Sequence, residues 1–390
     1  MVLLNPRFRA GAFIAAAFLV CSSCDSSDRL AAPPNTNVRG DSTAGPPSDS
    51  TGGAPPDSTG GAPTDSTGGE PTDSVPESPP IDTTSTPPPD GSGSPSPDSA
   101  GVVSRDTCIA MARASEGVSK TGVDASGIAF GAFDMPPRMM GSKFTGIARA
   151  SGSYDILCTL ATARRAGARI IVRMSGGDSY FRNEDRTLNL EKWKARIDRY
   201  KRVRVELQPF IDDGTLIGHY ILDEPHNLNT WKDGVPYSII EAMAKYSKEL
   251  WPNLPTVVRA YPDWLSNASF RWQYLDAAWA QYTSRKGEVT QWMKDQSAYA
   301  QREGLGLIVG LNLLNGGDAS SGIKGSRDGN WGMSAKQIRE WGTVLADDPH
   351  SCAFYSWRYN AGYFDRQDIE SALDEIASKA KNRDRKSCKG

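Results

Sequence analysis

Short apolar runs that alternate with amphipathic segments constrain the fold of this chain more than any other feature. Seven runs have the length of buried strands, namely residues 127–133, 168–174, 217–222, 256–260, 277–282, 306–311 and 352–357. Segments with helical apolar spacing lie between or after them, at residues 155–166, 190–210, 238–251, 288–302, 334–346 and 366–380. Nearly continuous apolar strands joined by helical crossovers are typical of a parallel sheet covered by helices.

The type of parallel sheet follows from what the turns contain. No Gly-x-Gly-x-x-Gly turn follows the first run, which argues against a dinucleotide-binding sheet. We therefore predict an α/β fold of the (β/α)8 TIM-barrel type. Residues 144–148 are the candidate for a degenerate strand, and without them the barrel is one strand short.

Composition separates this barrel from a long N-terminal stretch. Sixteen of the 26 prolines lie in residues 33–97, and residues 49–72 are three octapeptides, DSTGGAPP, DSTGGAPT and DSTGGEPT. Such a segment buries too little apolar surface to offset its ordering entropy, so residues 24–105 are predicted to be a disordered linker. Residues 106–390 hold all ten Trp and have the size of one barrel domain.

The net charge of −2 is also distributed unevenly between the N-terminal stretch and the barrel region. Residues 25–106 contain 13 acidic and three basic residues, which leaves a modest positive excess on the barrel region. No block of Lys or Arg occurs there, so nucleic acid is not an expected partner.

The N-terminus has the pattern of an export signal. Arg7 and Arg9 precede an apolar run at residues 10–20, which is too short to span a bilayer but suits a signal peptide. Residues 1–23 are therefore predicted to be removed.

The end of this signal resembles the lipobox of bacterial lipoproteins, in which a small residue precedes a lipidated Cys. Ser23 and Cys24 match that pattern, whereas Cys21 stands where an aliphatic residue is usual. The resemblance implies that Cys24 carries lipid and holds the protein to a membrane of the cell envelope, at the cell surface or in the periplasm. Plain secretion after cleavage at the same bond is the alternative.

Polar or aromatic residues follow almost every predicted strand. In a TIM barrel the C-terminal ends of the strands meet on the face that carries the active site. These residues are Asp134, Arg173, Asp223, Glu224, His226, Arg259, Tyr261, Asp263, Gln281, Tyr282, Asn312, Asn315 and Trp357. We therefore expect a shared site on this face.

The segment YILDEPH at residues 220–226 resembles strand four of the TIM-barrel glycoside hydrolase clan that has an Asn-Glu-Pro motif. In that clan the Glu is the general acid/base, which corresponds here to Glu224, while Asp223 replaces the Asn. Tyr282 and Trp357 correspond to a Tyr after strand six and a sugar-platform Trp after strand eight. The resemblance covers about residues 127–380 and implies a glycoside hydrolase that acts on a poly- or oligosaccharide.

The nucleophile of that clan is not found. Its place after strand seven reads GLNLLNGGD, in which Asn312 and Asn315 cannot act as carboxylates. Glycosidases need two carboxyl groups, about 5–5.5 Å apart when retaining and about 6.5–9.5 Å apart when inverting. The candidates for the second carboxyl are Asp223 and Asp318, followed by Asp134 and Asp263.

The predicted site therefore has Glu224, Asp223 and Asp318 as catalytic residues, with Asp223 as a modulator of the pKa of Glu224 or, alternatively, as its partner. The predicted substrate-binding residues are Arg173, Arg259, Tyr261, Tyr282, Asn312 and Trp357. For Arg173 and Arg259 the alternative is that they are buried ion-pair partners of the acidic residues. A barrel that lost its nucleophile and only binds carbohydrate is the alternative. A metal-dependent hydrolase built on Asp223, Glu224 and His226 is disfavoured, because no His or Cys pair has ligand spacing. No cofactor or metal is expected, and we expect a monomer.

Four cysteines remain in the predicted barrel region, and export would permit disulfides. Cys108 precedes the barrel and Cys388 follows its last helix. Because the ends of a closed barrel come near each other, we predict a Cys108–Cys388 bridge. Cys158 and Cys352 are then predicted to be buried free thiols.

Overall fold

A computed structural model describes residues 103–116 and 127–389. The predicted signal peptide, the lipidation site Cys24 and almost all of the predicted linker lie outside the described residues. Among the described residues, no helix combines the length and the apolar character needed to cross a membrane.

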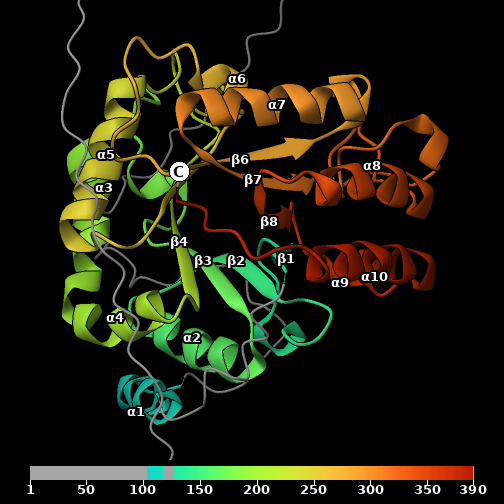
Figure 1. The fold of residues 1–390 in the computed structure, drawn as a ribbon. Coiled ribbons are helices and arrows are strands. Elements are labelled where there is room, and N and C mark those ends of the chain that lie inside the picture. The colour runs from blue at the N-terminus through green and yellow to red at the C-terminus, as the bar shows by residue number, and fades with distance from the viewer. Residues whose placement is uncertain (1–102, 117–126, 390) are drawn as a thin grey trace, which may run out of the picture. The chain divides into compact units, whose positions relative to one another are not determined.

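Eight parallel strands form one sheet in the order β1-β8-β7-β6-β5-β4-β3-β2 (Figure 1). They are β1 (Ala129–Ala132), β2 (Gly146–Ala150), β3 (Arg169–Arg173), β4 (Leu216–Asp223), β5 (Thr256–Arg259), β6 (Ala277–Tyr282), β7 (Gly306–Leu311) and β8 (Ser351–Ser356). A parallel bridge between Phe133 and Ala148 joins the end of β1 to β2. The sheet is thereby a nearly closed barrel, and the predicted TIM-barrel fold is confirmed. The segment predicted as a degenerate strand is β2, displaced by two residues.

Helices lie around the outside of the strands (Figure 1). They are α1 (Arg105–Ser115), α2 (Asp155–Ala166), α3 (Leu190–Asp198), α4 (Arg204–Asp212), α5 (Tyr237–Leu250), α6 (Pro262–Leu265), α7 (Val289–Glu303), α8 (Ala335–Asp347), α9 (Ala361–Phe364) and α10 (Gln367–Lys381). Short 3-10 turns are η2 (Pro137–Met139), η3 (Asp178–Tyr180), η4 (Arg199–Val203), η5 (Ser284–Lys286) and η6 (Ala319–Ser321). The amphipathic segment predicted at residues 190–210 is divided by η4 into α3 and α4.

Local sequence explains where several helices begin and end. α2 and α7 both end at a glycine with a left-handed backbone, Gly167 at φ 68° and Gly304 at φ 69°. Glycine adopts this conformation without the steric cost that a Cβ imposes. α8 begins with a capping box, in which Ser334 and Gln337 each satisfy a backbone N–H of the other.

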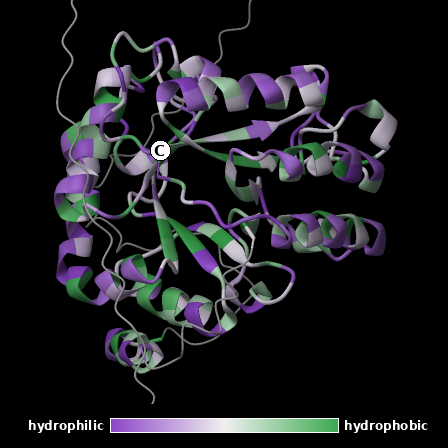
Figure 2. Ribbon diagram, viewed as in Figure 1, coloured by the Kyte–Doolittle hydropathy of each residue, from purple (hydrophilic) through white to green (hydrophobic). Residues whose placement is uncertain are grey.

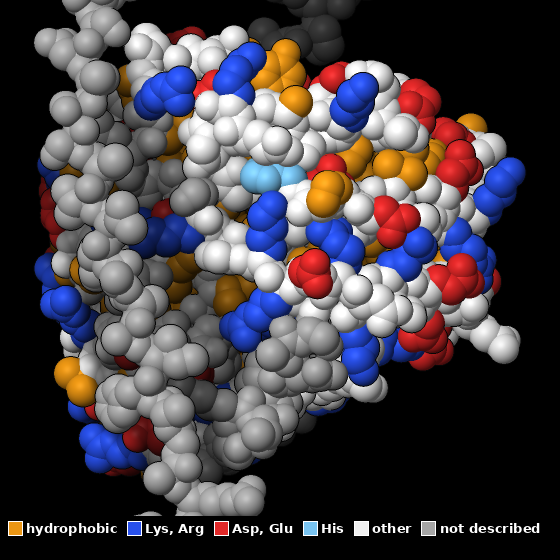
Figure 3. Space-filling model, viewed as in Figure 1, with side chains coloured by type: hydrophobic (Ala, Val, Ile, Leu, Met, Phe, Trp, Pro, Cys, Tyr) orange, Lys and Arg blue, Asp and Glu red, His pale blue; other side chains and the backbone are white. Residues whose placement is uncertain are grey.

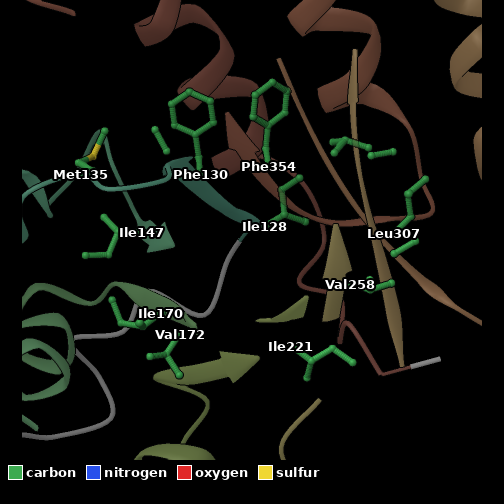
Figure 4. Packing of buried hydrophobic residues seen from close by; sticks show 14 of the residues in the cluster. Ile128, Phe130, Met135, Ile147, Ile170, Val172, Ile221, Val258, Leu307 and Phe354 are labelled. Carbon is green, nitrogen blue, oxygen red and sulfur yellow. The ribbon is translucent and has the colours of Figure 1, made fainter. Parts of the chain in front are cut away.

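The strands separate two apolar cores. The outer core lies between the sheet and the helices, and Figure 4 shows Ile147, Ile170, Val172 and Ile221 of three adjacent strands within it. The inner core lies inside the barrel and includes Phe133, Ile171, Tyr220, Trp279 and Tyr355. Figure 2 shows the matching distribution, with apolar residues on the strands and hydrophilic residues prominent on the helices.

Successive side chains of a strand point to opposite faces, so the inner core fixes which residues face inward at the C-terminal rim. These are Arg173, Asp223, Arg259, Gln281, Asn312 and Trp357. One irregularity occurs on β4, where the pairing with β5 skips Ile221. This bulge directs Tyr220 and Asp223 to the same inner face, and it pairs Asp223 with Arg259 across the two strands.

The predicted Cys108–Cys388 bridge is wrong, and so are the predicted free thiols. Cys108 is bonded to Cys158, and Cys352 is bonded to Cys388. α1 packs against α2 on the outside of the barrel, which brings Cys108 to Cys158 with a Cα–Cα distance of 4.6 Å. The C-terminal tail instead reaches the N-terminal ends of β7 and β8, where Cys388 contacts Gly306 and meets Cys352.

The surface drawn in colour in Figure 3 carries a mixture of charges. Lys and Arg side chains are interspersed with Asp and Glu on this face, and apolar side chains lie between them. This visible face therefore has no extended region of a single charge sign.

Candidate active site

A small polar pocket lies at the C-terminal rim of the barrel, between β4 and β7. It is lined by Glu224, His226, Arg259, Ala260, Tyr261, Trp279, Gln281, Thr283 and Asn312. Trp279 belongs to the inner core and is almost fully buried. The cavity volume is about 30 Å³, which is room for about two water molecules. Glu224 is the only carboxylate among these lining residues.

Asp223 lies beside this pocket in a buried ion-pair network. Its Oδ1 accepts a hydrogen bond of 2.5 Å from Arg259 Nε, and its Oδ2 lies 3.9 Å from Arg173 Nη1. Arg173 also pairs with Asp178 of η3. Burial opposes ionisation of Asp223, but the two guanidinium groups outweigh it and hold its pKa below the usual range. Asp223 is thus an ionised structural partner of two arginines.

Glu224 is held differently from its neighbour. Its Oε1 lies 3.2 Å from Arg259 Nη2, and its Oε2 accepts a hydrogen bond of 2.9 Å from Asn227 Nδ2. The side chain is 38% exposed, against 14% for Asp223. Its backbone has φ 39°, a left-handed conformation that is uncommon for a residue with a Cβ and is often found at functional sites. Glu224 is therefore oriented by two neighbours and still open to a ligand.

His226 and Tyr261 form an aromatic part of the pocket lining, next to Glu224. Their ring centroids are 5.4 Å apart, and Trp264 lies 5.6 Å from His226. Burial lowers the pKa of His226, which favours the neutral imidazole. Burial, together with the charge of Glu224, raises the pKa of Tyr261 to about 12. Both rings therefore contribute neutral polar groups near neutral pH.

Two amide side chains, Gln281 and Asn312, line the β6 and β7 side of the pocket. Gln281 Oε1 accepts a hydrogen bond of 2.9 Å from Arg259 Nη1. Gln281 Nε2, Asn312 Oδ1 and His226 Nδ1 are buried without a hydrogen-bond partner among the described residues. Buried polar atoms are nearly always satisfied in native proteins, so three such atoms in one pocket indicate a polar ligand or water.

Arg259, Tyr261 and Asn312, three of the predicted substrate-binding residues, line the pocket with Glu224. Two further predicted binding residues lie beside it rather than in its lining. Arg173 holds Asp178 and Asp223. Trp357 stacks on Phe133 at 4.5 Å and lies 4.1 Å from the guanidinium carbon of Arg259.

The structure places Tyr282 away from the pocket, against the prediction. Its hydroxyl donates to Gly287 O, and its ring packs against Trp292 and Trp341 in the outer core. At the C-terminal end of β6 the residue that faces inward is Gln281, because it lies two positions after the inward-facing Trp279. Strand alternation counted from an inward Trp279 would have selected it.

The three remaining carboxylates proposed as partners of Glu224 are also outside the pocket lining. Asp318 is the half-buried N-cap of η6, where it accepts hydrogen bonds from Ser320. Asp263 is exposed on α6, and its Oδ1 accepts from Trp264 N. Asp134 lies 3.8 Å from Arg358, and burial raises its pKa. In the described ranges, no group of three or more His, Cys, Asp or Glu is arranged to hold a metal ion.

No family model matches this chain, and no curated protein matches it. Among solved structures, a β-galacturonidase of Eisenbergiella tayi bound to galacturonate has 10% identity, a TM-score of 0.41 and coverage of 66% of this chain and 51% of its own. An endocellulase of Pyrococcus horikoshii with cellotetraose has 11% identity, a TM-score of 0.41 and coverage of 64% and 92%.

A β-D-glucuronidase of Dictyoglomus thermophilum has 11% identity, a TM-score of 0.42 and coverage of 67% of this chain and 52% of its own. This chain therefore spans about half the length of the β-galacturonidase and β-D-glucuronidase chains. These similarities are too distant to assign an activity, which has to be argued from the pocket.

Proposed function

We propose that this protein acts on carbohydrate and that Glu224 donates a proton to a glycosidic oxygen. The observation that supports this most directly is the composition of the pocket. One partly exposed carboxyl group shares the pocket lining with residues whose amide and imidazole atoms lack partners among the described residues. A sugar supplies hydroxyl groups that both donate and accept hydrogen bonds, so it would satisfy Gln281 Nε2 and Asn312 Oδ1 together.

Arg259 and Asn227 orient Glu224 in this proposal. Arg259 is itself fixed by Asp223 and Gln281, so Asp223 acts on Glu224 through Arg259 and is a positioning residue. Of the two roles expected of Asp223 from the sequence, modulator or partner of Glu224, this arrangement favours the modulator, because the carboxylate is already bound by Arg259 and lies close to Arg173.

The second candidate function is carbohydrate binding without hydrolysis, and one observation favours it. Asn312 occupies the rim of β7, where the clan that this sequence resembles has its nucleophile, and it supplies an amide instead. A retaining or inverting glycosidase needs a second carboxyl group near the first. Glu224 is the only carboxylate among the residues that line the pocket.

One experiment separates the two candidates. The full chain and its Glu224→Gln variant are screened for release of reducing sugar from glycans and for binding to a glycan array. Proton transfer by a positioned acid contributes about 10²–10⁴-fold in rate. We expect Glu224→Gln to lose at least about 100-fold in kcat on a natural glycan and to keep substrate binding.

An activated aryl glycoside is the internal control, because its leaving group needs little protonation and should suffer less. Unchanged hydrolysis of natural glycans by Glu224→Gln would rule out the acid role. Binding by both proteins without hydrolysis by either would favour the binding function.

We also propose that the protein is exported and carries lipid on Cys24. The basis is the signal-like pattern of residues 1–23 and the small Ser23 before Cys24. Detergent-phase partitioning of the expressed protein tests this proposal. The wild type should enter the detergent phase and Cys24→Ala should not, whereas aqueous partitioning of both would favour plain secretion.

A further inference from the structure

A second concavity adjoins the Glu224 pocket. It is an open groove of about 790 Å³, lined by His226, Tyr261, Asp263, Trp264, Ser266, Asn267, Lys286, Tyr299 and Arg302. His226 and Tyr261 line both the groove and the pocket. The groove lies over α6 and α7, which are neighbours in Figure 1 and are joined by a hydrogen bond from Asp263 N to Gln296 Oε1. A ligand held at the pocket can therefore continue into the groove.

The pocket and the groove differ in size, and this determines what each can hold. The pocket has room for about two waters, so it can take a reacting oxygen or a hydroxyl group but not a whole oligosaccharide. The groove is more than twenty times larger. The remaining sugar units of a bound glycan therefore have to lie in the groove or in the solvent.

Two cations of the groove lining lie beside aromatic rings of the same lining. Lys286 Nζ lies 3.8 Å from the ring centroid of Tyr261, and Arg302 Cζ lies 4.7 Å from that of Tyr299. Trp264 adds a third partly exposed ring. Aromatic faces suit the apolar faces of sugar rings, and the cations suit anionic substituents. The combination fits an acidic glycan better than a neutral one.

Lys286 is the residue that makes this preference specific. It is exposed at the end of η5, just after β6, and it forms no ion pair with a carboxylate among the described residues. Arg302, in contrast, already pairs with Glu303 at 3.2 Å. Asp263 is the one carboxylate among the groove-lining residues, and its Oδ1 accepts from Trp264 N. The charge of Lys286 is therefore available beside a ring that also lines the pocket.

We propose that this groove binds an anionic oligosaccharide, with a carboxylate or sulfate group on Lys286 and sugar rings against Tyr261 and Trp264. The proposal rests on the carbohydrate function assigned to the adjoining pocket, and it adds the substrate class. Uronate and sulfate ester groups offer the same charge to Lys286, so the probes below distinguish them.

The test measures binding by calorimetry in the full-length Glu224→Gln background, in which turnover is suppressed. The probes are a galacturonic acid hexasaccharide, a sulfated heparin hexasaccharide and neutral cellohexaose. At low salt, at least one anionic probe should bind about tenfold more tightly than cellohexaose. Adding Lys286→Ala should lower the affinity for that probe about fivefold, which is the contribution of one exposed ion pair. The affinity for cellohexaose should not change.

Two further variants separate charge from structure. Lys286→Arg should retain the preference, and Lys294→Ala, which removes another exposed lysine from α7 outside the groove, should change nothing. Trp264→Ala should lower the affinity for charged and neutral probes by the same factor. Equal binding of neutral and anionic probes, no binding of any probe, or an unchanged preference after Lys286→Ala would overturn the proposal.

The outcome is independent of the catalytic assignment. If wild type and Glu224→Gln hydrolyse glycans equally but Lys286 still selects anionic probes, the acid role fails and the anionic ligand stands. If Glu224 controls turnover of neutral glycans and Lys286 has no effect, the acid role stands and the anionic ligand fails.

Discussion

The two halves of the C-terminal rim, β3 to β5 and β6 to β7, differ in what their buried polar side chains bind. On β3, β4 and β5, charged groups pair with one another, with Arg173 on Asp178 and Arg259 on Asp223, although Arg173 Nε is buried without a hydrogen-bond partner among the described residues. On β6 and β7 the polar groups are the amides of Gln281 and Asn312, each of which leaves one buried atom without a partner.

This difference shows which half holds the site together and which half is incomplete without a ligand. A buried ion pair is costly to break, because the remaining charge is left uncompensated in a low dielectric. A buried amide that already lacks a partner has less to lose from substitution. We therefore expect the charged half to control stability and the amide half to control ligand affinity.

The largest effect should follow loss of Arg259. Arg259→Met leaves Asp223 buried beside only the more distant Arg173, and we expect the free energy of unfolding to fall by about 3–5 kcal/mol. Urea denaturation measures this change. Arg285→Met is the matched control, since Arg285 is exposed and donates a hydrogen bond to the backbone oxygen of Asn315, and it should cost less than about 1 kcal/mol.

A double variant tests whether the uncompensated charge of Asp223 causes the loss of stability. Adding Asp223→Leu to Arg259→Met removes the uncompensated charge and should recover part of the lost stability. A cost below about 1 kcal/mol for Arg259→Met alone would show that the ion pair does not hold this half together.

Acid unfolding should distinguish two carboxylates of the charged half. The pKa of Asp223 is lowered by Arg259 and Arg173, so its contribution to stability is present above the unfolded-state pKa of about 3.9 and is lost as the pH falls through the lower folded-state value. Burial raises the pKa of Asp178, so its protonation relieves a penalty as the pH falls. The two contributions have opposite signs.

Urea unfolding between about pH 6 and pH 2 should therefore show a smaller loss of stability for Asp223→Asn than for wild type, and a larger loss for Asp178→Asn. Parallel curves for all three proteins would show that these carboxylates do not titrate differently in the folded and unfolded states.

The smallest effect on stability should come from the amide half. Asn312→Leu removes an unpartnered oxygen, and we expect the free energy of unfolding to change by less than about 1 kcal/mol. Affinity for a bound glycan should fall about tenfold, because a hydrogen-bond partner of the ligand is lost. Unchanged affinity would mean that Asn312 Oδ1 does not face the ligand.

Much of the architecture could be predicted from the sequence because it depends on local patterns. Apolar runs separated by amphipathic segments predicted the barrel, and each of the seven predicted runs overlaps a strand. The Asp-Glu-Pro segment predicted that Glu224 would stand at the rim. Arg259, Tyr261 and Asn312 were found because residues after parallel strands meet on one face.

The errors concern features that depend on direction or on distant contacts. Tyr282 and Gln281 are adjacent in sequence, and only the inward orientation of β6 decides that Gln281 reaches the pocket. Asp223 and Glu224 are also adjacent, and a bulge on β4 together with two arginines from neighbouring strands gives them different roles. The expected second carboxylate at Asp318 failed to reach the pocket lining because its loop caps η6 instead.

The cysteines show the same limit at a larger scale. The sequence alone determined the alternating elements, the polar residues at their ends and the composition of the N-terminal stretch. Only the tertiary structure decided that Cys108 meets Cys158 and that Cys388 meets Cys352. The physical reason is that strand and helix periods are local, whereas docking of α1 on α2 and of the tail beneath β8 depends on packing between residues that are far apart in the chain.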